Sequence, residues 1–289
     1  MTRIWGISDL HVDYAENVAA IDQWSNWDFQ FDTLLVAGDL SDKLDLLGRT
    51  LATCRKKFAR VAYVPGNHEM WVKGTGRRDS VAKWAAICKL CENEGITQSE
   101  FKVAGRSPVT VIPLLSWYET QKDAGGTLYL PKGERDETDE MWMDFHLTGW
   151  PEIQSTLDYF LSQNPPVAEQ PMAERVITFS HFLPRQELMF SSGRVPPPGT
   201  TYPSDPHPAF NFSHVAGSTR IDEQLRAYGS ILHLYGHQHR NRAFSLDGVT
   251  YVSHCMGYPR ERSKGLLRGP ATHPRALWDT ELGSLVLIG

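Results

Sequence analysis

The sequence predicts an α/β fold built on one mixed β-sheet or on two packed sheets. The early apolar runs at 4–7, 33–37 and 61–64 are short and almost free of polar residues, which is typical of strands buried on both faces. Stretches with helical periodicity lie between these runs. Later runs are separated by tight turns such as Asp247-Gly248, which indicate antiparallel hairpins. Strand–helix alternation followed by hairpins favours this fold class.

The expected strands are short runs rich in β-branched and aliphatic residues. They span residues 4–7, 33–37, 61–64, 109–115, 176–179, 231–235, 243–246, 249–253, 276–279 and 284–288. The expected helices carry apolar residues at intervals of three and four or begin at a capping residue such as Asp79 or Ser80. They span residues 44–58, about 79–94, 150–162 and 220–227.

The composition is that of a globular chain with a large core. Hydrophobic residues make up 41% of the 289 positions, and we expect one domain over residues 1–289. The net charge of −5 argues against general nucleic-acid binding. The sequence has no apolar run of about 18 residues, no room for a signal peptide before its first strand, and only four cysteines. We therefore expect a cytoplasmic protein with no membrane partner.

Two segments have the composition of insertions. Residues 121–144 are polar and rich in glycine and charge, and residues 183–213 hold many of the prolines. Both follow expected strands, so they are predicted to form a lid or rim over a site at the strand ends. Ordinary surface loops are the alternative interpretation of both segments.

Five polar segments each follow an expected strand. They are Asp9-Leu10-His11, Gly38-Asp39, Gly66-Asn67-His68-Glu69, Ser180-His181 and Gly236-His237-Gln238-His239. Side chains at the ends of neighbouring strands converge on one side of a sheet. Oxygen and imidazole groups that converge in this way are the ligands that two divalent metals require.

The spacing within these segments fits metal binding. Asp9 and His11 stand two residues apart, so on extended backbone both side chains share one face. Gly38 permits a sharp turn at the strand end, and Asp39 has two carboxylate oxygens with which it can bridge two ions. Any one of these features is more often an ordinary surface residue than a ligand. All five in this order favour a metal centre.

The ordered set resembles the pattern of the calcineurin-like metallophosphoesterases, which runs Asp-x-His, Gly-Asp, Gly-Asn-His-Asp/Glu, His and Gly-His-x-His. The resemblance covers positions 9 to 239. It implies a four-layer αββα sandwich with a dinuclear site at the strand ends. The ligands that it implies for the first metal are Asp9, His11, Asp39 and His239. Those that it implies for the second are Asp39, Asn67, His181 and His237, with Asp39 bridging.

The resemblance also implies a mechanism. A metal-bridging hydroxide would attack phosphorus, and the metals would neutralise charge on the phosphoryl oxygens. His68 matches a histidine that is not a ligand and would protonate the leaving alkoxide, while Glu69 stands where an acid orients that histidine and would keep it charged. The oxygen and nitrogen ligands suit Mn²⁺, Fe or Zn²⁺. Because no tyrosine stands in the ligand motifs, Mn²⁺ or a mixed Fe/Mn or zinc site is favoured over a purple ferric centre.

Four further residues are candidates for contacts with substrate. Arg185 could bind a phosphate bidentately. Tyr118, His254 and Arg260 end or follow expected strands, and they could line the pocket. The alternatives are a surface salt bridge for Arg185 and ordinary packing for the other three.

The sequence as a whole predicts a metal-dependent phosphoesterase that hydrolyses phosphate mono- or diesters of small molecules. A nuclease of the same superfamily is one alternative, although the acidic balance argues against a basic groove. A non-catalytic scaffold with the same fold is another, and for a scaffold we would expect loss of ligand positions. All the expected ligand positions are intact.

Overall fold

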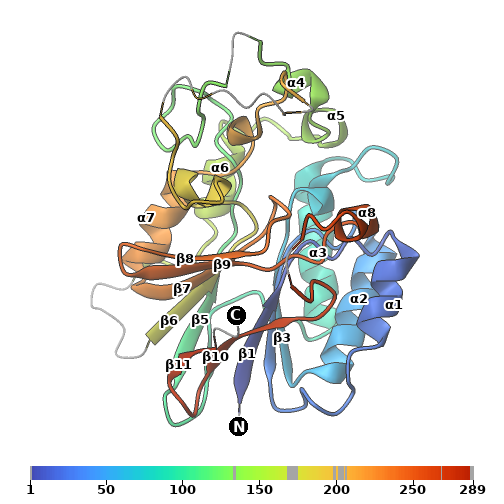
Figure 1. Cartoon of the computed structure of the whole chain (residues 1–289). Helices are drawn as coiled ribbons and strands as arrows, with labels where there is room; N and C mark the ends of the chain where they lie inside the picture. Colours follow the sequence, from blue (N-terminus) through green and yellow to red (C-terminus); the bar gives the residue numbers. More distant parts are fainter. Residues whose placement is uncertain are drawn as a thin grey trace.

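The chain forms two β-sheets that pack face to face between layers of helices (Figure 1). This is a computed structural model, and it describes residues 2–132, 135–167, 175–197, 200, 205, 207–267 and 269–286. The predicted αββα sandwich of two mixed sheets is confirmed.

The first sheet has the strand order β11-β10-β1-β2-β3. Its strands are β1 Arg3–Ile7, β2 Thr33–Ala37, β3 Arg60–Val64, β10 Arg275–Asp279 and β11 Ser284–Leu285. Strands β1, β2 and β3 are parallel, and β10 runs antiparallel to β1. The loops that follow the three parallel strands therefore emerge at the same edge of the sheet.

The second sheet has the order β4-β5-β6-β7-β9-β8. Its strands are β4 Phe101–Val103, β5 Val109–Pro113, β6 Arg175–Phe179, β7 Ser230–Tyr235, β8 Arg242–Leu246 and β9 Val249–Ser253. The four central strands are parallel, and β4 and β8 are antiparallel edges. The two sheets meet just beyond the end of β1, where the Ser8 amide donates to the His254 carbonyl over 2.9 Å.

Helices cover the outer faces of the sheets and the loops at the strand ends (Figure 1). They are α1 Ala15–Asp22, α2 Leu44–Lys57, α3 Ser80–Asn93, α4 Thr138–Met141, α5 Asp144–Leu147, α6 Thr156–Leu161, α7 Thr219–Ala227 and α8 Pro259–Ser263. Short 3₁₀ turns span His68–Met70, Gln186–Met189 and Phe212–His214. The expected cap is present at α3, where the Asp79 side chain accepts a hydrogen bond from the Ala82 amide.

Alternation along the buried strands separates the core into layers. In β2, Leu34 and Val36 pack with α2 and α3, while Leu35 and Ala37 face the second sheet. Because side chains alternate between the two faces of a strand, both faces of an all-apolar strand are buried. This packing fixes the positions of the strand ends and therefore of the loops that follow them.

The structure departs from the expected elements in several places. Strand β7 pairs parallel with β9, so the late strands are not a continuous set of antiparallel hairpins. The predicted helix at 150–162 is shorter, because α6 begins only after Ser155, whose hydroxyl accepts from the Asp158 amide. The last predicted strand, at 284–288, corresponds to β11, which spans only Ser284–Leu285. Residues 287–289 lie outside the described residues.

The two expected insertions differ in how fully they are described. Residues 121–144 include α4 and end at Asp144, the first residue of α5. Both short helices lie at the top of Figure 1, beyond the ends of the parallel strands. Part of 183–213 lies outside the described residues. Whether either segment acts as a lid or rim stays a prediction, as does the single domain over 1–289. Among the described residues, no helix is both long enough and apolar enough to cross a bilayer.

Candidate metal centre

The predicted ligands lie in loops at the carboxyl ends of β1, β2, β3, β6 and β7. Five of them adopt left-handed backbone with positive φ, a conformation that costs a non-glycine residue about 1–3 kcal/mol. They are Asp9 (52°), His11 (41°), Asp39 (55°), His237 (72°) and His239 (51°). The strain is held by hydrogen bonds between the loops, such as that from the Asp9 amide to the Gly38 carbonyl at 2.9 Å. Strain concentrated at these positions is typical of a functional site.

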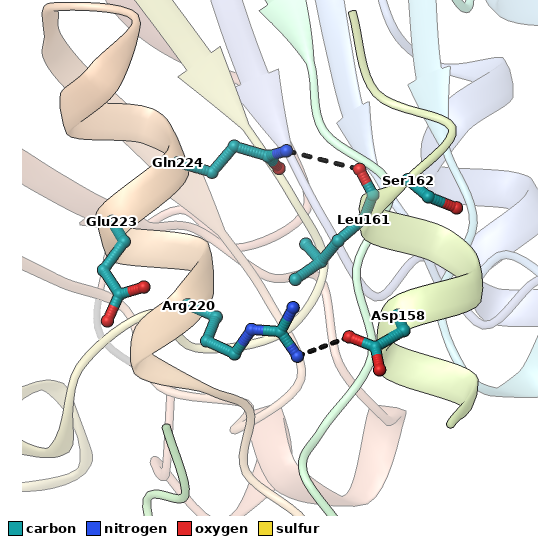
Figure 2. A pocket seen from close by; sticks show the side chains of 6 residues that line it. All are labelled: Asp158, Leu161, Ser162, Arg220, Glu223 and Gln224. Carbon is teal, nitrogen blue, oxygen red and sulfur yellow. Dashed lines mark hydrogen bonds and ion pairs between the residues drawn. The ribbon is translucent and has the colours of Figure 1, made fainter. Parts of the chain in front are cut away.

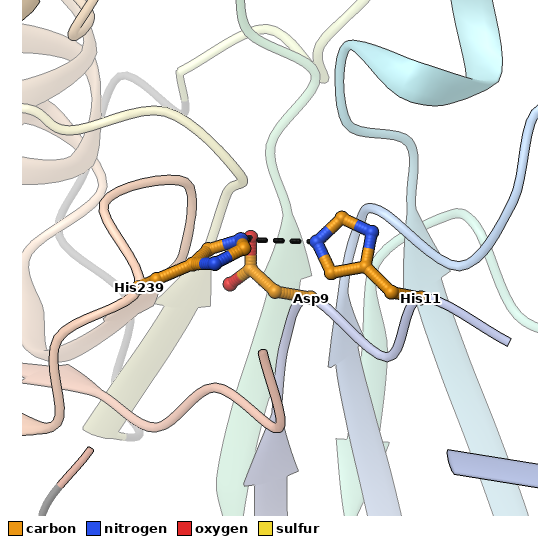
Figure 3. Close-up of side chains that lie close together, drawn as sticks. All are labelled: Asp9, His11 and His239. Carbon is orange, nitrogen blue, oxygen red and sulfur yellow. Dashed lines mark hydrogen bonds and ion pairs between the residues drawn. The ribbon is translucent and has the colours of Figure 1, made fainter. Parts of the chain in front are cut away.

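Asp9, His11 and His239 form the first cluster (Figure 3). The His11 and His239 Nε2 atoms are 2.9 Å apart, and His239 Nε2 lies 3.4 Å from Asp9 Oδ1. The Ser8 hydroxyl donates to Asp9 Oδ2, which fixes the orientation of the carboxylate. All three predicted ligands are buried, and their donor atoms face one another.

Asp39, Asn67, His181 and His237 form the second cluster. His181 Nε2 lies 3.2 Å from Asn67 Oδ1, 3.2 Å from His237 Nδ1 and 3.4 Å from Asp39 Oδ2. Asp39 also groups with His11 and His68 through donor atoms that lie within 4.8 Å of one another. Asp39 therefore lies between the two clusters, at the position that a bridging carboxylate requires.

The outer ring nitrogens of three histidines are bonded to fixed acceptors. His181 Nδ1 lies 2.9 Å from the Ala37 carbonyl, His237 Nε2 lies 2.9 Å from the Val215 carbonyl, and His239 Nδ1 lies 2.7 Å from a Glu261 carboxylate oxygen. Each ring must carry its proton on the nitrogen that faces the acceptor. In the neutral rings of His181 and His237 the opposite nitrogen then points a lone pair into the cluster, as metal-bound histidines do, and His239 does the same once its second proton is lost.

The electrostatics of the clusters also favour cations. Burial lowers the pKa of His11, His181 and His237, so these imidazoles are neutral and their lone pairs are free. Burial opposes protonation of His239 as well, but Asp9 and Glu261 outweigh it and raise the pKa of that imidazole to about 9. Burial, followed by the charges of Glu69 and Asp9, raises the pKa of Asp39. Carboxylates crowded beside neutral imidazoles are a donor set that fits divalent metal ions.

His68 lies at the edge of this centre. Its side chain is 16% exposed, its Nε2 is 3.8 Å from Asp39 Oδ2, and its ring stacks on Trp71 with a centroid distance of 3.8 Å. Burial, followed by the neighbouring histidines, lowers the pKa of His68 to about 3. The expectation that Glu69 keeps this imidazole charged is therefore wrong.

Glu69 has different partners from those expected. Its carboxylate accepts hydrogen bonds from the amides of Gly66, Asp39, Leu40 and Ser41 at 2.6–3.3 Å. These bonds join the loop after β3 to the loop after β2. Glu69 thus fixes the backbone that carries Asp39 and does not orient the ring of His68.

Arg185 does not face the metal centre. Its guanidinium pairs with Glu187 at 2.6 Å and with Asp247 at 2.8 Å, and Asp222 lies 3.6 Å away. Because three carboxylates surround this guanidinium, it has no pair of N–H donors left with which to bind a phosphate bidentately. The predicted phosphate contact is wrong, and the alternative interpretation as a salt-bridge residue is correct.

Tyr118 and His254 are buried behind the centre rather than exposed in it. The Tyr118 hydroxyl donates to Asp144, and His254 Nε2 bonds the His273 carbonyl at 2.7 Å. Neither side chain is free to contact a substrate in this arrangement. Arg260 is exposed, and its guanidinium lies over the ring of Tyr258 at 5.4 Å. The Tyr258 ring in turn packs on His11 at 4.4 Å, so Arg260 is exposed and is connected to the first cluster through Tyr258.

A cavity of about 440 Å³ lies elsewhere, between α6 and α7 (Figure 2). Its lining residues include Asp158 and Arg220, which form an ion pair with each other. Gln224 donates a hydrogen bond to the Leu161 carbonyl across the same space. None of the predicted ligands lines this cavity, and two of its three charged side chains pair with each other.

Two packed sheets with oxygen and imidazole donors gathered at their strand ends define a metal-dependent hydrolase of the metallophosphoesterase type. The sequence model of the family described as calcineurin-like phosphoesterase matches residues 2–241. The chain belongs to the calcineurin-like phosphoesterase family. It is a phosphoric ester hydrolase, and the scaffold alternative is not supported.

Two comparisons show individual proteins that are similar to this chain. The chain is 28% identical over 278 residues to the [acyl-carrier-protein] phosphodiesterase PptH of Mycobacterium tuberculosis, covering 89% of this chain and 78% of that protein. The crystal structure of phosphopantetheinyl hydrolase (PptH) from Mycobacterium tuberculosis superposes with a TM-score of 0.71. At 22% identity, that superposition covers 96% of this chain and 95% of the other. The second comparison establishes a shared fold.

Gly66 provides a test of how closely the centre is packed. A Cβ atom at this position would lie 2.2 Å from Asp39 Oδ1 and 2.8 Å from the Asp39 amide nitrogen. We expect Gly66→Ala to displace the Asp39 carboxylate and to lower phosphoesterase activity about 10²-fold, the usual effect of a misplacement near 1 Å. Metal content and kcat/KM are the measurements. Gly125→Ala is the control, because nothing lies within 4 Å of its Cβ position. Equal activity in both variants would contradict the close packing.

Proposed function

We propose that this protein hydrolyses phosphodiesters with a pair of divalent cations held at the strand ends. One observation carries the proposal: seven residues with oxygen and nitrogen donors fall into two buried clusters, and Asp39 of the second also groups with His11 of the first. We assign Asp9, His11, Asp39 and His239 to the first cation. We assign Asp39, Asn67, His181 and His237 to the second.

When bound, the cations would activate a water as nucleophile and neutralise charge on the phosphoryl oxygens. The seven assigned ligands are buried, so they would hold this pair where electrostatic stabilisation is stronger than in water. We assign His68 to the leaving oxygen, to which a partly exposed ring at the edge of the centre can donate a proton or a hydrogen bond. Mn²⁺ is the favoured metal, with iron, zinc or a mixed pair as alternatives, since the donor set accepts all of them.

The substrate that we propose is a phosphopantetheinyl group attached to an acyl carrier protein. The name of the mycobacterial relative supports this choice over the small-molecule ester expected from sequence. A surface beside the centre also supports it. Met141, Met143 and Phe145 are 43%, 47% and 40% exposed and alternate along the chain with Trp142 and Asp144, which turn inward. An apolar surface next to the clusters suits contact with a protein.

A metal add-back experiment tests the proposal. The protein is stripped of metal, supplied singly with Mn²⁺, Fe²⁺, Zn²⁺, Ni²⁺ or Mg²⁺, and assayed on bis-p-nitrophenyl phosphate and p-nitrophenyl phosphate. We expect no activity without metal, and at least about tenfold higher kcat/KM for the diester with the best metal, which is a difference near 1.4 kcal/mol in the barrier. Absence of hydrolysis with every metal would contradict the proposed chemistry.

The substrate class is tested separately in the same assay. Phosphopantetheinylated acyl carrier protein is compared with a small phosphopantetheinyl diester and with a DNA oligonucleotide. We expect the carrier protein to have the highest kcat/KM. If the small diester reacts equally well, the protein part of the proposal is wrong and the small-molecule interpretation stands. Preference for DNA would support the nuclease alternative.

A further inference from the structure

Asp144 is a buried carboxylate that the sequence did not mark as functional. It comes at the end of the 121–144 segment and is 1% exposed. Its Oδ1 accepts from Asn67 Nδ2 at 2.9 Å and from Trp71 Nε1 at 2.6 Å. Its Oδ2 accepts from Trp142 Nε1 at 2.7 Å and from the Tyr118 hydroxyl at 3.2 Å. Four donors therefore converge on one side chain.

We propose that Asp144 is a positioning residue of the metal centre, which sets the orientation of the Asn67 amide. A carboxylate accepts hydrogen bonds but does not donate them, so it draws the amide nitrogen of Asn67 toward itself. The amide oxygen then faces the second cluster, where it lies 3.2 Å from His181 Nε2. The reversed amide would present two hydrogens to a cation. The inference rests on the proposed function, since it supposes that Asn67 binds metal.

The Asp144 carboxylate also affects His68 and His237, through the two tryptophans that donate to it. Trp71, which donates to Oδ1, stacks on the ring of His68. Trp142, which donates to Oδ2, meets the ring of His237 edge to face with centroids 5.7 Å apart. Asp144 thus determines where two indole rings lie against a predicted ligand and against the residue assigned to the leaving group. Outer-shell partners of this kind change metal affinity when they are replaced.

Asp144→Asn tests the role with little change in shape. The new amide has only one oxygen for four donors, so the Asn67 amide loses its fixed partner. We expect the affinity for the second equivalent of Mn²⁺ to fall about 10–100-fold, measured by calorimetric titration of metal-free protein, with the first equivalent much less affected. The proposed activity does not enter this measurement. A wild type that binds two equivalents but hydrolyses no ester would refute the function and leave the Asp144 result interpretable.

Asp136→Asn is the matched control, because Asp136 lies in the same segment and is also a multiple acceptor. Its carboxylate bonds Tyr129 at 3.1 Å and Thr138 at 2.6 Å and pairs with Lys122 at 2.9 Å, away from the predicted ligands. Both variants should lower the melting temperature of the metal-free protein, but only Asp144→Asn should weaken the second metal. Equal second-site affinity in wild type and Asp144→Asn would overturn the inference. So would a wild type that binds a single equivalent.

Exchanging the two side chains gives a second test if Asp144→Asn folds poorly. Asn67→Asp alone sets two carboxylates face to face, so we expect it to bind the second Mn²⁺ at least tenfold more weakly, although a carboxylate is the stronger ligand for this metal. Asn67→Asp combined with Asp144→Asn restores a donor opposite an acceptor and should recover part of the affinity. Recovery is partial because Trp71 loses its acceptor. Tight binding by Asn67→Asp alone would show that Asp144 does not set the orientation of residue 67.

Discussion

His68→Ala is expected to retain two equivalents of metal and to lose about 10²–10⁴-fold in kcat on a diester with an alkoxide leaving group. The ring is partly exposed at the edge of the clusters and is held by its stack on Trp71, so a leaving oxygen can reach it. Because burial lowers the pKa of this histidine to about 3, the ring acts in its neutral form and donates from N–H. The loss should be much smaller on bis-p-nitrophenyl phosphate, whose leaving group needs little help from a donor.

Metal content decides between two interpretations of the same loss. The geometry also groups His68 with His11 and Asp39 as a possible metal triad. If His68→Ala binds one equivalent less than wild type, His68 is a ligand and the assignment to the leaving group is wrong. If activity falls equally on both leaving groups with metal intact, His68 stabilises the transition state elsewhere. Trp71→Phe is a useful companion, because it keeps a ring beside His68 and removes only the indole donor to Asp144.

The positions of the predicted ligands could be found from sequence because each ligand follows a strand. Asp9, Asp39 and His181 each stand two residues beyond the ends of β1, β2 and β6, and parallel strands in packed sheets bring such positions together. The apolar character of those strands was enough to predict their burial. What the pattern could not show is the backbone of the loops, where five of the predicted ligands adopt positive φ although none of them is glycine. That conformation depends on hydrogen bonds between loops distant in sequence.

The supporting residues could not be found in this way. Asp144 lies 77 residues from Asn67, and Glu261 lies 22 residues from His239, with no spacing that relates the partners. Their contacts arise only when α5 and α8 pack over the strand ends. Arg185 is the opposite case, because Glu187 stands two residues further along the chain. That nearby acid was a visible signal for a salt bridge and against a free phosphate site.

Short elements were missed for a related reason. Strand β4 has three residues and forms only because β5 offers an edge for antiparallel pairing. Helix α1 has a weak apolar stripe, and its buried Asn17 is held by bonds to the Leu10 and Gly257 carbonyls. Periodicity reports long amphipathic segments well. Hydrophobic periodicity does not detect short elements that are stabilised mainly by tertiary contacts.

Asp39→Asn is expected to have the largest effect of all, since Asp39 belongs to the second cluster and also groups with His11 of the first. The amide keeps the shape and still accepts from the His68 amide, but it has one neutral oxygen with which to replace a bridging carboxylate. We expect weak binding at both metal positions. The losses of nucleophile activation and of charge stabilisation are each worth about 10²–10³-fold, so the combined fall in kcat/KM is about 10⁴–10⁶-fold. His181→Ala, which changes a residue of the second cluster only, should weaken one equivalent and reduce activity less.

The same substitution should stabilise the metal-free protein, which separates a functional role from a structural one. Burial and the nearby Glu69 raise the pKa of Asp39 above its ordinary value of 3.8. A group whose pKa is raised on folding binds its proton more tightly in the folded state. Its contribution to stability is therefore present below pH 3.8 and is lost as the pH rises toward the folded pKa. Near neutral pH, Asp39→Asn removes the free-energy cost of burying a charged carboxylate. The substitution should therefore raise the melting temperature of the metal-free protein by roughly 2–4 °C, the shift that corresponds to about 1 kcal/mol. Calorimetry with and without Mn²⁺ measures both effects. If the Asp39 carboxylate serves metal binding at a cost to stability, removing its charge should stabilise the metal-free protein. A lower melting temperature for metal-free Asp39→Asn would therefore mean that the carboxylate supports the fold itself.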